Sequence, residues 1–210
     1  MQQRPGPRSR PTMILLLIVV LCLPVTGWAQ APDSTGDAAL EYRYRTQDDE
    51  AAAPYVTTPR PLVDSMLSMA EVGPDDVVYD LGSGDGRIPI RAATKYGARG
   101  VGIEIKPELV ETARTNAAAA GVADRVTFRR ADFFEADIAD ATVVTLYLLP
   151  SVNLQLRAKL LRTLRPGTRV VSHDFHMAEW TPDETKEVDG TLLYLWRVPA
   201  EVPEFVESNR

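Results

Sequence analysis

Three glycines at alternate positions, Gly82, Gly84 and Gly86, follow the apolar stretch Val77–Leu81 and strongly constrain what this chain can form. Glycines at this spacing let a backbone pass close under a ligand where any Cβ would collide. The turn leads into a helix expected to begin near Arg87, so unpaired helix N–H groups face that ligand. A dinucleotide fingerprint needs a third glycine at the position that Arg87 occupies. The turn therefore predicts either a cradle for a ligand of another class or a tight strand–helix corner.

Apolar runs alternate with helical segments after this turn. The expected strands are Val77–Leu81, Gly100–Ile105, Val126–Arg130, Ala141–Leu149 and Thr168–Phe175, and the helices between them begin near Arg87, Pro107, Phe133 and Val152. Upstream, Leu62, Met66 and Met69 share one helical face. This alternation is typical of an α/β domain whose parallel sheet is covered on both faces.

The end of the chain predicts a different element. Asp189-Gly190 lies between two extended runs within Glu187–Val198, which is a strong hairpin signal. A nicotinamide dehydrogenase more often continues with a sixth parallel strand. Five parallel strands followed by a hairpin therefore favour a different member of the Rossmann-like folds.

The N-terminus has the layout of an export signal. Basic residues precede the apolar run Met13–Leu23, and a small-residue site ends at Ala29. We expect a cleaved signal peptide, with a retained membrane anchor or a misassigned start codon as alternatives, and hence a bacterial protein that is exported, periplasmic or membrane-associated. The expected organisation is a signal or anchor at 1–29, a flexible linker at 30–53, the main domain at 54–200 and a tail at 201–210. The net charge of −6 argues against a nucleic-acid partner.

The segment Asp80–Gly86, D-L-G-S-G-D-G, resembles the first motif of class I S-adenosylmethionine (SAM) methyltransferases. Acids follow the first three strands, at the sheet edge where α/β folds bind ligands. We expect Asp80 to accept a hydrogen bond from the amino-acid part of SAM and Glu104 to accept the ribose hydroxyls. Asp132 would accept from the adenine amino group, and Phe133 would cover the base. The structural alternatives are a turn cap for Asp80, a helix cap for Glu104 and a core position for Phe133.

Several segments together resemble a narrower group, the mitochondrial protein-lysine methyltransferases that act on the ATP synthase c subunit and the adenine nucleotide translocase. They are P-Y-V-T-T-P at 54–59, V-Y-D-L-G-S-G-D-G-R at 78–87, G-A-R-G-V-G-I-E-I at 97–105, V-T-L-Y-L-L-P at 144–150 and G-T-R-V-V-S-H-D-F at 167–175. The resemblance implies a seven-stranded class I methyltransferase sheet with a terminal antiparallel hairpin. It also implies methyl transfer from SAM to a lysine of a protein, including a membrane protein.

The proposed chemistry suggests roles for individual residues, with a purely structural role as the alternative for Tyr147, His173, Asp174, Tyr55 and Thr57. Tyr147 would orient the amine, while Asp174 and His173 would accept its proton or fix the acceptor loop. The predicted cofactor-binding residues are Tyr55, Thr57, Asp80, Gly82, Ser83, Gly84, Asp85, Gly86, Glu104, Asp132 and Phe133. No metal site is predicted, because the two histidines form one local cluster without distant partners.

Two other functions fit the same residues. One is a methyltransferase for a small molecule or RNA, although the acidic balance disfavours RNA. The other is an exported protein that binds SAM or a nucleoside without chemistry, since SAM supply outside the cytoplasm is doubtful.

Overall fold

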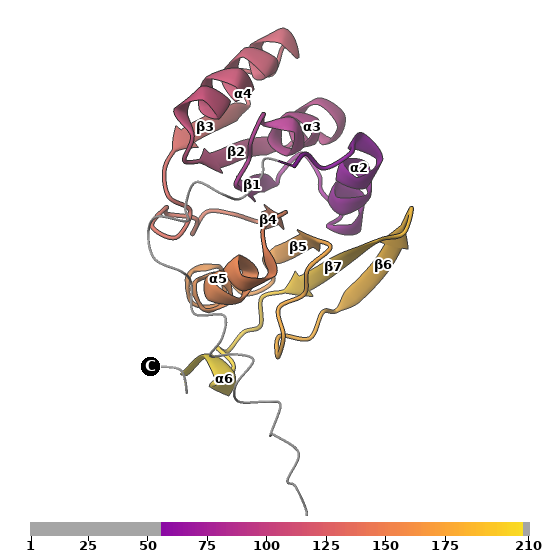
Figure 1. Ribbon diagram of the computed structural model, residues 1–210, viewed down its shortest axis with the longest axis vertical. Helices are drawn as coiled ribbons and strands as arrows, with labels where there is room; N and C mark the ends of the chain where they lie inside the picture. The colour runs from indigo at the N-terminus through magenta and orange to yellow at the C-terminus, as the bar shows by residue number, and fades with distance from the viewer. Residues whose placement is uncertain (1–55, 208–210) are drawn as a thin grey trace, which may run out of the picture. The chain divides into compact units, whose positions relative to one another are not determined.

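The computed structural model describes residues 56–207, which fold around a seven-stranded sheet with the strand order β3-β2-β1-β4-β5-β7-β6 (Figure 1). The strands are β1 Val77–Leu81, β2 Arg99–Glu104, β3 Val126–Arg130, β4 Val143–Leu146, β5 Arg169–His173, β6 Glu184–Val188 and β7 Thr191–Arg197. The first five strands are parallel, whereas β7 runs antiparallel to both β5 and β6. The predicted class I methyltransferase sheet is confirmed.

The central strands are buried because helices cover both faces of the sheet. All five residues of β1 are buried, as an apolar strand at the centre of a parallel sheet requires. β4 is shorter than the predicted 141–149. It pairs with β1 and β5 only over 143–146, and the chain then leaves the sheet to begin α5.

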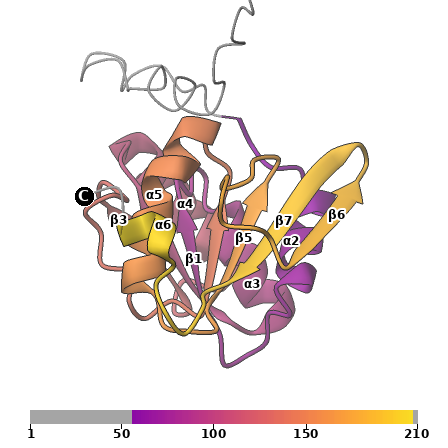
Figure 2. The same cartoon turned by 90° about the horizontal axis from the view of Figure 1, so that it is seen from below.

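Two layers of helices enclose the sheet (Figure 2). One face carries α2 (Arg60–Met69), α3 (Arg87–Tyr96) and α4 (Pro107–Ala119), and the other carries α5 (Pro150–Thr163) and the short α6 (Glu204–Glu207). The predicted helical face of α2 is buried, including Leu62, Met66 and Met69. Val206, in the segment expected as a tail, packs into the same cluster as α5.

The helix predicted near Phe133 does not form. Residues after β3 instead make a turn in which Asp132 accepts hydrogen bonds from the backbone N–H groups of Phe134, Glu135 and Ala136. Lys159 of α5 donates to the carbonyl oxygens of Phe133, Phe134 and Ala136. These carbonyl oxygens therefore accept hydrogen bonds from a side chain distant in sequence instead of from the backbone N–H groups of a helix.

The predicted hairpin is confirmed in detail. β6 and β7 are joined by Asp189 and Gly190 alone, with φ angles of 51° and 80°. Two successive residues at positive φ define the type I′ turn, whose twist matches that of the flanking strands. Figure 1 shows this hairpin at the opposite end of the sheet from β3.

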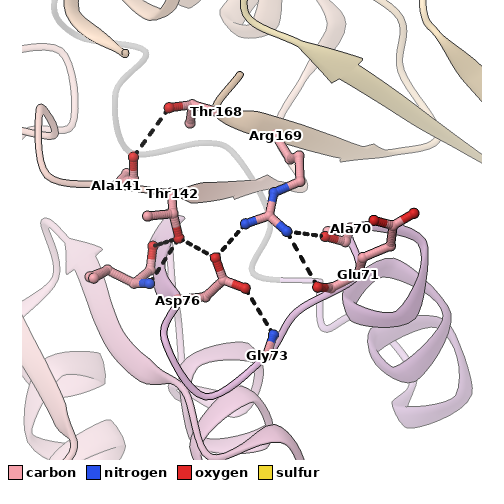
Figure 3. A network of polar contacts seen from close by, with 9 residues as sticks. Ala70, Glu71, Gly73, Asp76, Ala141, Thr142, Thr168 and Arg169 are labelled. Carbon is pink, nitrogen blue, oxygen red and sulfur yellow. Dashed lines mark hydrogen bonds and ion pairs between the residues drawn. The ribbon is translucent and has the colours of Figure 1, made fainter. Parts of the chain in front are cut away.

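A network of polar contacts joins the first residues of three parallel strands (Figure 3). Asp76, just before β1, forms an ion pair with Arg169 of β5 and accepts a hydrogen bond from Thr142 Oγ1 at 2.6 Å. Thr142 Oγ1 also accepts from the Val77 N–H, and Arg169 Nη1 donates to the Ala70 carbonyl at the end of α2. The network therefore fixes β1, β4, β5 and α2 relative to one another at the edge opposite the carboxyl ends of the strands.

The signal or anchor at 1–29, the linker at 30–53 and the candidate Tyr55 lie outside the described residues. Within residues 56–207, no helix has the length and apolar character needed to cross a membrane.

Replacing Asp76 with Asn should lower the free energy of unfolding by about 3 kcal/mol, because it leaves the largely buried Arg169 without its counter-charge. Burial acts to raise the pKa of Asp76, but the bonds from Thr142, Gly73 and Arg169 outweigh it and hold the pKa below its usual value. The stability that this carboxylate supplies is present above about pH 4 and is lost as pH falls through the folded-state pKa. Urea unfolding at pH 7 and at lower pH measures both effects.

The matched control is Asp140→Asn, which breaks the exposed pair with Arg165. Exposed pairs contribute little, so this variant should unfold like the wild type. Equal losses in the two variants would contradict the role assigned to the Asp76 network.

Candidate active site

The glycine turn after β1 adopts a left-handed backbone geometry that glycine accommodates without strain. Gly82, Gly84 and Gly86 adopt φ angles of 77°, 52° and 79°, a region that other residues rarely enter. A Cβ on Gly86 would lie 2.5 Å from Phe128, and one on Gly82 would lie 2.9 Å from a methyl of Leu148. The N–H groups of Gly82 and Ser83 both donate to the carbonyl of Ile103 in β2. Both the backbone angles and the close packing therefore require glycine here.

Glu104 connects this turn to the end of β2. Its Oε2 accepts from the Gly84 N–H at 2.9 Å, and its Oε1 accepts from the N–H groups of Ile105 and Lys106. The carboxylate therefore caps local backbone and also lies against the glycine turn. Oε2 accepts from one donor among the described residues and keeps capacity for a ligand hydroxyl. The ribose-binding role stays a prediction, and the geometry is compatible with it.

Asp80 places a buried acid beside the same turn. Thr145 Oγ1 donates to its Oδ1 at 2.7 Å, and the residue is only 4% exposed. Burial raises the pKa of Asp80 to about 7; the Thr145 bond opposes this rise, while the charges of Glu104 and Asp85 add to it. A buried acid whose charged neighbours are acids is suited to a cationic ligand.

A small cavity of about 40 Å³ brings many of the predicted residues together. It is lined by Val56, Thr57, Thr58, Asp80, Gly82, Ser83, Gly84, Asp85, Arg87, Ile88 and Tyr147. Ser83 Oγ on this wall is buried and has no hydrogen-bond partner among the described residues. The acid, the free hydroxyl and the glycine turn fit the ammonium and sulfonium cations of SAM. Glu104, Gly86, Asp132, Phe133, His173 and Asp174 do not line this cavity.

Arg87 forms part of the wall and is held by Asp85. Its Nε and Nη2 donate to the two carboxylate oxygens of Asp85, and its Nη1 donates to the Thr58 carbonyl at 2.9 Å. A larger cavity of about 570 Å³ lies beyond this pair, between α2, α3 and α4, and shares Asp85 and Arg87 with the small one. The small cavity, and not this one, is lined by Asp80 and by two glycines of the turn, and the position of the cofactor stays a prediction.

The end of β3 gives a mixed result for the predicted adenine site. Asp132 is half-buried, and its Oδ1 accepts from the Phe134 N–H at 2.7 Å. Phe133 and Phe134 lie with ring centroids 4.9 Å apart and pack against the core cluster below α5. The adenine role of Asp132 and Phe133 stays a prediction. Ile105, which the sequence analysis did not select, is 51% exposed beside Glu104 and offers an apolar surface for a flat base.

The predicted catalytic residues lie at the ends of β4 and β5. The rings of Tyr147 and His173 stack with centroids 3.7 Å apart and planes at 21°. His173 is buried, which lowers its pKa, although the neighbouring Asp174 acts to raise it. Asp174 is exposed and has a φ of 70°, a costly conformation of the kind that often marks functional sites.

Asn153 holds the segment that contains these residues. Its Nδ2 donates to Ser172 Oγ at 3.0 Å and to the Phe175 carbonyl at 3.2 Å, on either side of His173 and Asp174. Sequence reasoning gave Asn153 no role. The available signal was an amide in the first turn of an otherwise apolar helix face.

Comparisons with known proteins identify the family of this chain. Residues 80–184 match the model of the ANTKMT methyltransferase domain. The chain is 48% identical over 148 residues to a protein-lysine N-methyltransferase of Saccharolobus islandicus, covering 68% of this chain and 92% of that protein. The chain belongs to the ANTKMT methyltransferase family. It is therefore a SAM-dependent methyltransferase.

Two further relatives help to define the family. The chain is 40% identical over 130 residues to the mouse adenine nucleotide translocase lysine N-methyltransferase, but spans only 56% of its length. A crystal structure described as an RNA methyltransferase from Salinibacter ruber, bound to S-adenosylhomocysteine, is 63% identical with a TM-score of 0.70. It covers 71% of this chain, and this chain covers 97% of it. The methyltransferase fold and cofactor are shared, while these relatives are named for different substrates.

Asp80 should make cofactor affinity depend on pH. A cationic ligand favours the ionised carboxylate, so with a pKa near 7 the affinity for SAM should fall about fivefold between pH 7 and pH 6. The stability of the ligand-free protein should depend on pH in the opposite direction. The folded state holds a proton that the unfolded state releases, so this group's contribution declines as pH rises from about 4 to 7. Calorimetry and thermal unfolding with wild type and Asp80→Asn test both, and an unchanged pH dependence in the variant would contradict the assignment.

Replacing Glu104 with Ala should weaken S-adenosylhomocysteine binding at least tenfold, because charge-assisted bonds to buried acceptors contribute about 1.5–3 kcal/mol each. Asp132→Ala tests the adenine prediction in the same calorimetric assay. The exposed Asp140→Asn variant serves as a control with unchanged affinity. Unchanged affinity in both site variants would overturn the cofactor orientation proposed for these strand ends.

Proposed function

We propose that this methyltransferase transfers methyl groups to lysine side chains of proteins. The observation that carries the proposal is the 48% identity to a protein-lysine N-methyltransferase across 92% of that protein. The mouse relative is also named as a lysine N-methyltransferase. Both support a protein acceptor for this chain.

The charge of the described surface supports a cationic acceptor over RNA. Residues 173–189, which follow the end of β5 and include β6, carry six acidic side chains and one lysine. Phosphate groups of RNA would be repelled by this segment, whereas a lysine ammonium would be attracted. RNA methylation remains the second candidate function, because the Salinibacter ruber structure is described in those words.

The chemistry divides between the cofactor and the protein. SAM supplies a methyl group bonded to a positively charged sulfur, which a nitrogen lone pair can attack. A lysine ammonium has no lone pair, and its pKa of about 10.4 must be overcome by desolvation or a nearby acceptor. Tyr147 on the cavity wall can orient the amine through its hydroxyl or ring face. Asp174, exposed at the end of β5, can attract the ammonium and accept its proton.

A membrane-associated or exported location is proposed from the N-terminal sequence alone. The basic residues and the apolar run Met13–Leu23 are the support for it. Such a location would bring membrane proteins within reach as acceptors. Fractionation with a topology reporter fused after Arg210 tests this proposal independently of the acceptor chemistry.

Incubation with SAM carrying a labelled methyl group tests the acceptor class. Soluble and membrane extracts receive wild-type enzyme or Glu104→Ala, and the labelled material is then treated with protease or ribonuclease. The proposal expects protease-sensitive label that yields methyl-lysine on acid hydrolysis and mass spectrometry. Label that ribonuclease removes would contradict it and establish the RNA alternative.

Asp174→Asn should lower kcat/KM for the protein acceptor about 100-fold without changing the melting temperature, since a positioned proton acceptor contributes about 10²-fold or more to proton transfer. Asparagine tolerates the left-handed backbone at φ 70°, so the fold is kept and only the charge is lost. Asp174→Ala is the comparison, and it should lose activity and also some stability. Full activity in Asp174→Asn would exclude this carboxylate from the reaction.

A further inference from the structure

Thr58 contacts both Arg87, at the start of α3 beside the predicted cofactor site, and His173, at the end of β5 beside the predicted acceptor site. It is 3% exposed and precedes α2. Its carbonyl oxygen accepts from Arg87 Nη1 at 2.9 Å, at the start of α3. Its Oγ1 lies 3.2 Å from His173 Nδ1, although the two residues are 115 positions apart. One buried threonine therefore connects the cofactor side, through Arg87, to the end of β5.

His173 supports Tyr147 from outside the small cavity. The two rings stack with centroids 3.7 Å apart, and of the two only Tyr147 lines the cavity. Burial lowers the pKa of His173, which keeps the ring neutral at pH 7. A neutral, stacked ring behind Tyr147 is placed to fix the plane of the phenol.

The direction of the Thr58–His173 hydrogen bond follows from what each group has available. Nδ1 is the one hydrogen-bond partner of Thr58 Oγ1 among the described residues. If the hydroxyl donates, no buried proton is left unpaired, and Nδ1 serves as the acceptor. The imidazole proton is then on Nε2. In this tautomer neither ring nitrogen has a free lone pair for the acceptor's proton.

We infer that Thr58 is a positioning residue whose hydroxyl fixes the tautomer and plane of His173 and, through their stacking, the position of Tyr147. The lysine acceptor in this picture rests on the proposed function. His173 then supports Tyr147 instead of accepting a proton, which leaves Asp174 as the acceptor. His173 and Tyr147 are therefore held in this arrangement only when the segment that contains Thr58 packs against His173.

Nitrogen NMR of histidine-labelled enzyme tests the positioning directly and needs no acceptor. The chain has two histidines, and the exposed His176 serves as an internal reference. In the wild type, His173 should show a protonated Nε2 and an unprotonated Nδ1. Thr58→Val removes the donor at almost constant shape and should give a mixture of tautomers, while Thr58→Ser should restore the wild-type pattern. Thr185→Val, on the exposed strand β6, should leave the spectrum unchanged.

A protonated Nδ1 in the wild type, or identical spectra for wild type and Thr58→Val, would overturn the inference. Circular dichroism confirms that each variant is folded.

Transfer of labelled methyl to the membrane extract supplies the kinetic measurement. Thr58→Val should reduce kcat about tenfold, because small displacements of positioning groups are costly, and Thr58→Ser should recover most of it. An unchanged kcat in Thr58→Val would contradict the positioning role. If the wild-type enzyme labels no protein, the proposed function fails, while the NMR result still decides the role of Thr58.

Discussion

The ion pair between Asp76 and Arg169 lies at the edge of the sheet opposite the site, yet the site depends on it. It joins the starts of β1 and β5, and Thr142 adds the start of β4. Because β1, β4 and β5 are similar in length, fixing their starts also brings their carboxyl ends to one edge, where α/β folds bind ligands. The register that results pairs Asp80 with Thr145, which is why Thr145 can donate to the buried carboxylate.

The site concentrates acidic side chains around a tightly hydrogen-bonded glycine turn. Asp80, Asp85 and Glu104 all lie beside the glycine turn, and the charges of Glu104 and Asp85 both raise the pKa of Asp80. In the absence of a cation, these neighbouring carboxylates destabilise the ionised form of Asp80, because buried like charges repel one another. The cationic cofactor of this family offsets that cost. Specificity for SAM over a phosphorylated cofactor follows from the same charges.

Local patterns in the sequence predicted most of the fold. The bounds of β1 and β3, the Asp-Gly hairpin and the glycine turn depend on neighbouring residues, so they could be read directly. The helix expected at Phe133 failed because Lys159, which is distant in sequence, binds the carbonyls of that segment. The contact between Thr58 and His173 was equally out of reach, since no local pattern links residues so far apart. The conformation of both segments therefore depends on polar contacts between residues distant in sequence, which local propensity does not reveal.

A crystal structure of the enzyme with S-adenosylhomocysteine tests the central claim most directly, namely that the cofactor lies between the glycine turn and the Thr57–Thr58 segment. The account predicts the ribose hydroxyls at Glu104 and the amino group at Asp80, with Tyr147 beside the sulfur. A ligand bound instead in the larger cavity between α2, α3 and α4, with Glu104 contacting only the backbone, would contradict it.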